Sequence, residues 1–505
     1  MKDPDFIVVG SGPNGLVAAN MLARRGYRVL VLEAHPRRPG GAVASEELTR
    51  PGFVHDVGAG FFSFGRSSPA FRELELEAAG LRWVNAPFES CHPALDGTYA
   101  CIARDPEDQA AHFGSPADGA TFAALARFHA GVEKNLLDAL LRPFPALLPL
   151  VKLGVPALAR LATLLLRSSG GLSRSLFESD AARRVIPSLG LHVDVGPEDT
   201  FGAPLAYVLG LTATTGGYAV PVGGARSLTN TLVTTLEQHG GHLMLGAEVT
   251  RVIVRGGRAE GVVLANGEEI RTRLGVLADT SAPGLYLSLL ERNDVPRWLR
   301  VRMRRFELGF GTFKLDWALS APVPWRVEAA RRSAVVHAAE SIDDLSRFAR
   351  EVRSGRIPEQ PYLVIGQHTL ADPSRAPAGA HTLYAYSRVP PYLPGGWQNA
   401  AEHFADRVEE RIEALAPGFR QTILARHYFA PSDLERMDAN LLGGDLGGGS
   451  NAWHHQLVFR PVFPYFRYRT PVRGLYLCSS YAHPGAGVHG MCGFNAAQMA
   501  ARDAA

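Results

Sequence analysis

Three short apolar runs in the sequence are expected to be buried strands of one parallel sheet. The first is Phe6–Val9, the second is Val29–Leu32, and the third, residues 474–478, lies almost at the other end of the chain. Near-continuous runs of this kind are typical of strands that are covered on both faces. A helix is predicted over residues 15–25, so the first two runs and this helix form a βαβ unit.

The middle of the chain predicts further pieces of the same domain. A helix-like stretch follows Val222-Gly223-Gly224, two alternating strands are predicted at 247–254 and 259–264, and a closing helix is predicted over 490–501. Two intervening stretches are too long and too mixed in pattern to be loops. We therefore predict an α/β fold in which a discontinuous domain (1–86, 219–290 and 471–505) carries an inserted α+β domain (87–218 and 291–470) that shapes the substrate cavity.

Residues 136–166 are strongly apolar, but four prolines and several basic residues interrupt them. Prolines and charges at this density argue against a membrane-spanning helix. Two interpretations stay open. The region is either a pair of short helices packed on the core, or a membrane-surface patch or tunnel mouth for a lipophilic substrate, with Lys152, Arg160 and Arg167 facing anionic lipid.

Composition narrows the class of protein. Hydrophobic residues make up 46% of the 505 residues and charged residues 20%, as in ordinary soluble enzymes. A net charge of +3 gives no indication of a nucleic-acid partner. The four cysteines lack metal-ligand spacing, so we expect no metal site and a cytoplasmic location.

The clearest chemical motif is Gly10-Ser11-Gly12-Pro13-Asn14-Gly15, a GxGxxG between a predicted strand and a predicted helix. Its glycines allow a tight turn, approach of the backbone to a pyrophosphate, and close helix packing, while the helix N-terminus attracts the phosphate charge. Glu33 ends the second strand about 20 residues further on, where a carboxylate binds the adenosine ribose. The motif therefore predicts a dinucleotide site without distinguishing NAD from FAD.

The segments that follow resemble a known family. Pro39-Gly40-Gly41-Ala42 and Asp56-Val57-Gly58 resemble segments of the flavin amine oxidase and phytoene desaturase superfamily. Phe459-Arg460-Pro461-Val462 and the string from His483 through Pro484-Gly485-Ala486-Gly487-Val488 to Gly490 are similar to its phytoene dehydrogenase-related branch. The resemblance implies a Rossmann-type FAD-binding domain, and non-covalent FAD as the cofactor.

Carried onto this sequence, the resemblance implies a set of FAD-binding residues. They are Gly10, Gly12, Pro13, Asn14, Gly15, Glu33, Ala34, Gly40, Gly41, Ala42, Gly58, Ala59, Val249, Ser479, Ser480, Gly487, Val488 and His489. In this superfamily, the C-terminal glycine-rich turn delivers a helix N-terminus to the flavin ring. Many relatives carry an acidic residue where this chain has Ser479 and Ser480, and a hydroxyl can still form a hydrogen bond there.

Three residues are candidates for the redox chemistry. Lys314, in Gly311-Thr312-Phe313-Lys314-Leu315, resembles the amine oxidase lysine that faces flavin N5 through a water, although strand alternation allows it to face solvent instead. His483 and His489 lie in the flavin-facing turn. Each is either catalytic or a structural histidine.

These features predict an FAD-dependent oxidoreductase that removes a hydride from a lipophilic, isoprenoid-like substrate. No second GxGxxG stands in a strand-turn-helix context, so we expect electrons to leave to oxygen or a quinone. An amine or amino-acid oxidase is one alternative. A redox-neutral isomerase or a non-catalytic flavoprotein is another, since a shared fold does not fix function.

Overall fold

A parallel five-stranded sheet lies at the centre of the nucleotide-binding half of the molecule. The computed structural model describes residues 3–505. The strand order is β19-β13-β1-β2-β9, and every neighbouring pair is parallel. Its members are β1 (Phe6–Val9), β2 (Val29–Leu32), β9 (His242–Met244), β13 (Gly275–Ala278) and β19 (Leu475–Leu477). The chain runs outward from β1 on one side and returns on the other, so β1 and β13 flank the topological switch point where such sheets bind ligands.

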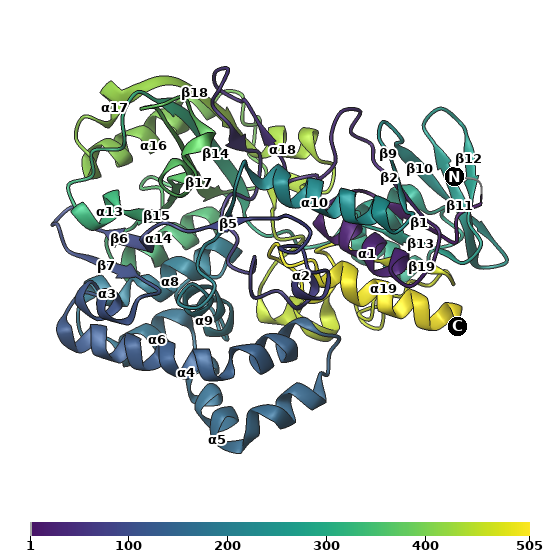
Figure 1. The fold of residues 1–505 in the computed structure, drawn as a ribbon, viewed down its shortest axis with the longest axis horizontal. Helices are drawn as coiled ribbons and strands as arrows, with labels where there is room; N and C mark the ends of the chain where they lie inside the picture. Colours follow the sequence, from purple (N-terminus) through teal and green to yellow (C-terminus); the bar gives the residue numbers. More distant parts are fainter. Residues whose placement is uncertain (1–2) are drawn as a thin grey trace.

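Three helices pack around this sheet. They are α1 (Pro13–Ala23), α10 (Ala225–Gln238) and α19 (Met491–Ala504). Figure 1 shows the C-terminal helix α19 lying beside α1 although the two are at opposite ends of the sequence. The apolar residues of α1 and of β1, Phe6–Val9, are buried in the core that these helices cover.

A small antiparallel sheet, β10-β11-β12, extends from this domain. Its strands are β10 (Val249–Arg255), β11 (Arg258–Leu264) and β12 (Glu269–Arg271). In Figure 1 it projects at the right-hand end of the molecule. The two strands predicted at 247–254 and 259–264 are thus confirmed, with shifts of one or two residues at their ends.

The second half of the molecule contains a seven-stranded mixed sheet in the order β18-β14-β17-β16-β15-β6-β7, in which only β15 and β6 pair in parallel. One face carries Phe313, Leu315 and Trp317, which form a second core that includes residues of α16 (Ala401–Leu415). The strands are β6 (Phe88–Pro93), β7 (Tyr99–Ile102), β14 (Gly311–Leu319), β15 (Ser333–Ala338), β16 (Leu363–Gly366), β17 (His381–Val389) and β18 (Ile423–Phe429).

The remaining elements are helical or very short. The longer helices are α4 (Pro116–Leu141), α5 (Leu147–Leu165), α9 (Ala203–Thr212) and α14 (Ile342–Arg353). Shorter helices are α2 (Pro69–Glu73), α3 (Pro106–Ala111), α6 (Ser169–Leu176), α7 (Asp180–Arg183), α8 (Val185–Gly190), α11 (Ala282–Gly284), α12 (Arg297–Arg304), α13 (Glu328–Arg331), α15 (His368–Ala371), α17 (Phe419–Thr422) and α18 (Pro431–Met437). Single turns are η1 (Leu191–Val193), η2 (Leu285–Leu289), η3 (Pro373–Arg375), η4 (Leu442–Gly444), η5 (Trp453–His455) and η6 (Leu457–Phe459), and the two-residue strands are β3 (Ser45–Glu46), β4 (His55–Asp56), β5 (Trp83–Val84) and β8 (Val220–Pro221).

The predicted α/β fold class with a Rossmann-type domain is confirmed. The strands of the parallel sheet come from residues 6–32, 242–278 and 475–477, and those of the mixed sheet come from 88–102 and 311–429. The detailed domain boundaries stay a prediction. The chain passes back and forth between the two sheets, and these crossings do not define the residue at which one domain ends.

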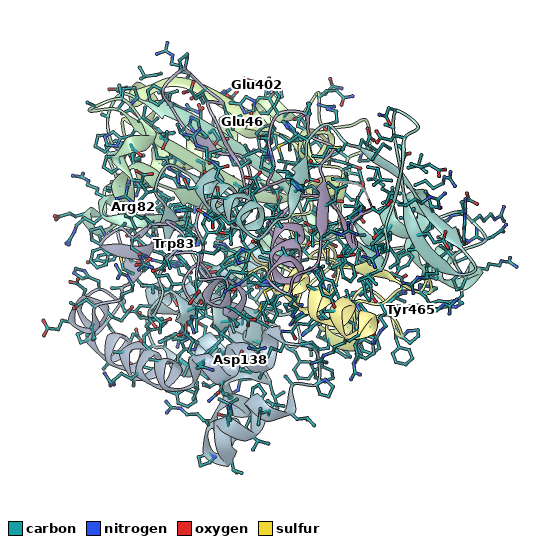
Figure 2. All side chains as sticks on the ribbon, turned by 45° about the vertical axis from the view of Figure 1, so that its right-hand side comes forward. Glu46, Arg82, Trp83, Asp138, Glu402 and Tyr465 are labelled. Carbon is teal, nitrogen blue, oxygen red and sulfur yellow. The ribbon has the colours of Figure 1, made fainter. Side chains whose placement is uncertain are left out.

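The interpretation of residues 136–166 as a pair of short helices packed on the core is confirmed only in part. α5 is two helical pieces joined at a kink at Gly154, and Leu161 and Leu164 of the second piece lie in the core, whereas the first piece is largely exposed. α4 continues to Leu141, and α5 follows as a helix that projects away from both sheets (Figure 1). Figure 2 labels Asp138, near the point where the chain leaves α4 for α5. In α5 only Leu161 and Leu164 are buried, whereas Val151 is 75% exposed and Val155 80% exposed.

The contact between α1 and α19 generates a stability prediction. A Cβ added at Gly493 would lie 1.8 Å from the carbonyl oxygen of Asn14, far inside van der Waals contact. Gly493→Ala should therefore push α19 off α1 and lower the free energy of unfolding by about 1–3 kcal/mol, the usual cost of overpacking. Chemical denaturation followed by circular dichroism measures this.

Gly131→Ala in α4 is the matched control. Gly131 is helical and exposed and has no neighbouring atom within 4 Å of an added Cβ. Helix propensity alone should make this variant more stable by roughly 1 kcal/mol. Equal stability changes of the two variants would show that α19 tolerates displacement from α1.

Candidate functional site

The GxGxxG turn adopts the geometry that its glycines predict. Gly10 follows β1 with φ +94°, a conformation that favours glycine. α1 begins at Pro13 directly after Gly12, and proline suits a first helical position because its missing N–H has no partner there. A Cβ at Gly15 would lie 2.3 Å from the Gly10 carbonyl oxygen, so only glycine allows this close helix packing.

Glu33 lies beside the turn, as predicted for a ribose-binding carboxylate. Its Oε2 accepts hydrogen bonds from the backbone N–H of Ser11 at 2.9 Å and from the Ser11 hydroxyl at 2.5 Å. Its Oε1 accepts the backbone N–H of His35 at 2.8 Å, and Ala34 lies between these two residues. The carboxylate is thereby fixed at the end of β2, next to the start of α1.

The predicted Gly40-Gly41-Ala42 segment packs on this turn. The N–H of Gly40 donates to the carbonyl of Ser11 at 3.1 Å, and an added Cβ at Gly41 would lie 3.8 Å from the Cα of Gly12. The Asp56-Val57-Gly58 segment runs alongside. A Cβ at Gly58 would lie 2.6 Å from the Ala42 carbonyl oxygen, which also accepts the N–H of Ala59 at 3.2 Å.

Asp56 joins several segments of the site. Its Oδ1 accepts from the Ser45 hydroxyl at 2.6 Å and from the first N–H of α10, that of Ala225, at 2.8 Å. Its Oδ2 accepts from Arg375 at 2.8 Å. Burial alone would raise the pKa of Asp56, but the Arg375 guanidinium and these hydrogen bonds hold it below its usual value. A buried carboxylate with this many partners fixes the loop that carries Gly58.

The C-terminal segment closes over the same region. Cys478 donates its N–H to the Ala278 carbonyl at 2.9 Å, and the Ser479 hydroxyl donates to the Thr280 carbonyl at 2.6 Å. Ser480 follows, and its carbonyl accepts from Arg460 at 3.0 Å. Gly490, with φ +67°, is the residue before α19, and its added Cβ would lie 2.6 Å from a Val17 methyl carbon.

The donor chemistry of this region fits a dinucleotide. The turn offers the N-terminus of α1 for the phosphates and the Glu33 carboxylate for the ribose. Gly12 and Gly41 have no side chains, so their backbone can approach a ligand closely. The buried Oδ1 of Asn14 has no hydrogen-bond partner among residues 3–505. Val249, one of the predicted FAD-binding residues, begins β10. It lies close in sequence to Ala247, whose N–H donates to the Glu33 carbonyl at 2.8 Å.

His483 and His489 are both buried in the closing segment. His483 Nε2 lies 3.1 Å from the Arg142 carbonyl, and His489 Nδ1 accepts the N–H of Met491 at 3.1 Å. Burial lowers the pKa of His483 to about 4 and that of His489 to about 3, so both imidazoles are neutral at pH 7. The residues between them, Gly487 and Val488, lead directly to the N-terminus of α19. The catalytic role predicted for the two histidines stays a prediction.

Lys314 faces into the molecule, which excludes the solvent-facing alternative. It lies on β14, is 3% exposed and forms an ion pair with Asp316. Asp316 Oδ1 lies 3.5 Å from His55 Nδ1, which connects the pair to the Asp56-Val57-Gly58 segment. Burial would raise the pKa of Asp316, but the Lys314 ammonium lowers it below its usual value. That Lys314 faces the flavin stays a prediction.

Aromatic side chains surround Lys314 on the same face of the mixed sheet. Its ammonium lies 5.5 Å from the centroid of the Tyr384 ring, and the Tyr384 and Tyr386 rings stack with centroids 6.2 Å apart. Phe61, three residues after Gly58, stacks on His368 at 4.5 Å. Added Cβ atoms at Gly366 would collide with Tyr384 and Phe61, so that glycine makes room for the aromatic cluster.

A hydrogen-bonded chain continues from this face into the interior. The Tyr386 hydroxyl lies 2.9 Å from His192 Nδ1, and His192 Nε2 lies 2.6 Å from His337 Nε2. Burial lowers the pKa of His192 to about 3 and that of His337 well below its usual value, so this chain is uncharged.

Sequence reasoning missed Arg460, although the segment that contains it carries part of the family resemblance. This buried guanidinium donates to the carbonyl oxygens of Gly447, Gly448 and Ser480 at 2.7–3.0 Å. It therefore fixes the loop after η4 to the predicted ribityl-side residues. A single arginine in a loop is not part of a motif with defined residue spacing, so its role is visible only in the folded structure.

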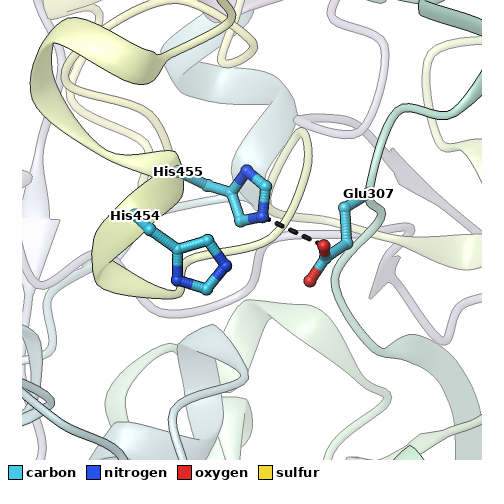
Figure 3. A group of neighbouring side chains, drawn as sticks. All are labelled: Glu307, His454 and His455. Carbon is cyan, nitrogen blue, oxygen red and sulfur yellow. Dashed lines mark hydrogen bonds and ion pairs between the residues drawn. The ribbon is translucent and has the colours of Figure 1, made fainter. Parts of the chain in front are cut away.

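A separate group of potential ligands lies on the surface. Figure 3 shows His455 turned toward Glu307, with His454 beside it on the same short turn, η5. His455 Nε2 lies 3.0 Å from Glu307 Oε2. The potential metal-ligand atoms of Glu307, His454 and His455 all lie within 4.8 Å of one another. Glu307 and His454 are exposed to water, and the group lies outside the set of residues predicted to bind FAD.

Comparison with known proteins agrees with this geometry. Residues 8–74 match the NAD(P)-binding Rossmann-like domain family. The chain is 30% identical to the rat pyridine nucleotide-disulfide oxidoreductase domain-containing protein 2 over 99% of this chain and 93% of the rat protein. It is 27% identical to the phytoene desaturase (neurosporene-forming) of Cereibacter sphaeroides, covering 96% and 92%, and 27% identical to the all-trans-zeta-carotene desaturase of Myxococcus xanthus, covering 95% and 90%.

Solved structures share the fold across almost the whole chain. An oxidoreductase from Methanosarcina mazei superposes with a TM-score of 0.65 at 17% identity, covering 99% of this chain and 100% of that one. Cyclohexylamine oxidase from Brevibacterium oxydans superposes with a TM-score of 0.60 at 17% identity, covering 99% of each. At these identities the likeness concerns the fold alone.

The buried ion pair on β14 generates a prediction. Lys314→Met removes the ammonium and leaves the Asp316 carboxylate buried without its cationic partner, with His55 Nδ1 3.5 Å from its other oxygen. Breaking a buried pair in this way costs about 3–5 kcal/mol, so the variant should unfold at markedly lower denaturant concentration. Adding Asp316→Asn removes the unpaired charge and should restore part of that stability.

The double variant is therefore the matched control for the single one. Unfolding curves of wild type, both single variants and the double variant form a double-mutant cycle. Additive losses, with no recovery in the double variant, would contradict an energetically coupled pair.

Proposed function

This chain belongs to the family of pyridine nucleotide-disulfide oxidoreductase domain-containing protein 2, and from that premise we propose that it dehydrogenates a lipophilic, isoprenoid-like substrate taken from a membrane surface. It is an FAD-dependent oxidoreductase with a Rossmann-type cofactor domain. Phytoene and zeta-carotene, which two similar proteins act on by name, are isoprenoid hydrocarbons that dissolve in lipid rather than in water.

The exposed surface of α5 is the observation that carries the proposal. By length and composition this helix is apolar enough to cross a membrane, and only 11% of its most apolar stretch is buried. Leu147, Leu148, Val151 and Val155 are all more than 60% exposed. An apolar surface of this kind is costly in water and is typical of a site that contacts lipid or a partner.

The kink and the basic residues of α5 indicate that the helix lies on the surface of a bilayer and does not span it. Gly154 has non-helical dihedrals and Pro156 follows it, so the helix is kinked at its middle. Lys152 and Arg160 lie within the same stretch, and Arg160 stacks on Phe128 of α4 with its guanidinium 4.1 Å from the ring centroid. Basic residues flanking an apolar helix face suit the headgroup region of an anionic bilayer. We propose a cytoplasmic protein that binds the membrane surface through α5.

The chemistry follows from the cofactor and from the residues on β14 and β17. When bound, FAD would accept a hydride from one substrate C–H bond, and the proton of the neighbouring carbon would leave to a base or to water. In the proposal, the aromatic face formed by Phe61, Tyr384 and Tyr386 holds a hydrocarbon in place and excludes water. Lys314 supplies a positive charge that stabilises negative charge developing during the redox step. Oxygen or a membrane quinone is the proposed electron acceptor.

The same residues favour a neutral substrate over an amine. Two stacked tyrosines can form an aromatic cage for an amine cation. A buried cation also needs a carboxylate partner. Here the Asp316 carboxylate is already paired with Lys314, and Asp56 is paired with Arg375. A neutral lipophilic substrate needs no such partner.

Anaerobic reduction of the flavin by candidate substrates tests the proposal. Purified protein is mixed with acyclic polyenes, cyclic terpenes or amines, and the absorbance of the oxidised flavin is followed. Bleaching by an isoprenoid hydrocarbon, with appearance of a product two hydrogens lighter, is the expected result. Bleaching by amines alone would favour the amine oxidase alternative, and an isomerised product without net flavin reduction would identify an isomerase.

Membrane attachment through α5 is tested separately. Full-length protein should co-sediment with vesicles that contain anionic phospholipid, because apolar burial and charge attraction act together. Reversing Lys152, Arg160 and Arg167 to Glu should reduce the bound fraction by at least tenfold and leave flavin content unchanged. Reversal of Arg25, Arg82 and Arg255, which lie on other surfaces, is the control and should have little effect. Equal sedimentation of the two triple variants would contradict attachment through α5.

A further inference from the structure

A buried carboxyl group lies where the dinucleotide phosphates are expected. Asp279 directly follows β13, and its N–H donates to the Val9 carbonyl of the neighbouring strand β1 at 2.8 Å. The residue is 7% exposed, and its Oδ2 accepts the N–H of Gly15 in the first turn of α1 at 2.8 Å. An added Cβ at Gly12 would lie only 2.6 Å from the same oxygen.

Asp279 thus uses the part of the site that attracts an anion. The N-terminus of α1 carries the positive end of the helix dipole and offers N–H donors. An ionised Asp279 occupies one of these donors, the Gly15 N–H, and would repel a pyrophosphate that approaches the same glycines. The buried carboxylate and the phosphates are therefore in conflict unless the carboxyl group changes its charge.

The surroundings of Asp279 disfavour the ionised form. Across residues 3–505 no Lys, Arg or His side chain forms an ion pair with it. Arg38, a basic residue close to the Gly40-Gly41 pair, donates instead to Glu46 at 2.5 Å and to the Gly41 carbonyl at 3.0 Å. Burial raises the pKa of Asp279 to about 8, although the Gly15 N–H lowers it.

Four other titratable groups face Asp279. The carboxylates of Asp438, after α18, and of Glu33, at the end of β2, each raise its pKa. Asp438 is itself half-buried, and an added Cβ at Gly41 would lie 3.0 Å from its Oδ2. Cys478, after β19, and Cys492, in α19, are buried thiols whose own pKa values are raised, so they are uncharged at neutral pH.

We propose that Asp279 is protonated when FAD is bound and donates a hydrogen bond to a phosphate oxygen of the cofactor, so that binding to the ionised form takes up one proton from solvent. A neutral carboxyl keeps its acceptor oxygen for the Gly15 N–H and gains a donor on the other oxygen. It then adds a hydrogen bond to the cofactor at the place where a carboxylate would repel it.

The affinity for FAD at different pH values tests this. Full-length protein freed of flavin is titrated with FAD between pH 6.5 and pH 9, and binding is followed by quenching of flavin fluorescence. Since the free carboxyl titrates near pH 8, Kd should be nearly constant below that pH and should rise by about tenfold between pH 7 and pH 9, as one linked proton requires. Calorimetry at pH 8.5 in buffers of different ionisation enthalpy should show uptake of between half and one proton for each FAD bound.

Asp279→Asn and Glu33→Gln form the matched pair of variants. Asn keeps the size and a donor without a titrating proton, so its Kd should be independent of pH. Glu33→Gln should weaken FAD binding by at least tenfold because it alters the ribose contact. It should keep a rise of Kd with pH, and that rise should begin at a lower pH because the Glu33 charge that raises the pKa of Asp279 is gone. A pH-independent Kd and no proton uptake in the wild type would overturn the proposal. Those wild-type measurements decide it even if the Asp279 variant fails to fold.

Discussion

The close contact between the first and last helices of the chain is the constraint on which the rest of the site depends. Gly493 lets α19 approach the backbone of α1 so closely that its missing Cβ would overlap the Asn14 carbonyl oxygen. The contact joins residues almost 480 positions apart and places the turn with His489 and Gly490 beside the GxGxxG turn. Without this contact, the C-terminal turn would not cover the βαβ unit that carries the GxGxxG motif.

The N-terminal part of the site was predictable because its signals are local. A strand, a glycine turn, a helix and a carboxylate occur within 33 residues, and each has one physical role. The structure confirms the βαβ unit and places Glu33 in hydrogen-bond contact with Ser11. The C-terminal turn was found through its resemblance to a family, since nothing in its own pattern shows that it packs on α1.

The residues that sequence reasoning missed act through long-range contacts. Asp279 was hidden because a single acid after a strand is common, and its meaning depends on β13 pairing with β1. Arg460 donates hydrogen bonds to backbone carbonyl oxygens, which every residue has, so the sequence does not identify its partners. The choice between the two interpretations of residues 136–166 could not be made from the sequence for a different reason. An apolar helix is normally buried, and the sequence contains no sign that the rest of the chain leaves the first half of α5 uncovered.

The polar face of the mixed sheet is compatible with a hydrocarbon substrate because its charges are already paired. Lys314 pairs with Asp316, Arg388 pairs with Asp194 at 3.1 Å, and the Tyr386-His192-His337 chain is uncharged. A buried charge without a partner would demand a charged or strongly polar ligand. Here a neutral molecule can lie on the rings of Phe61 and Tyr384 without leaving an ion unpaired. Because each ion already has its partner, a lipophilic substrate and a sheet face that carries ion pairs are mutually consistent.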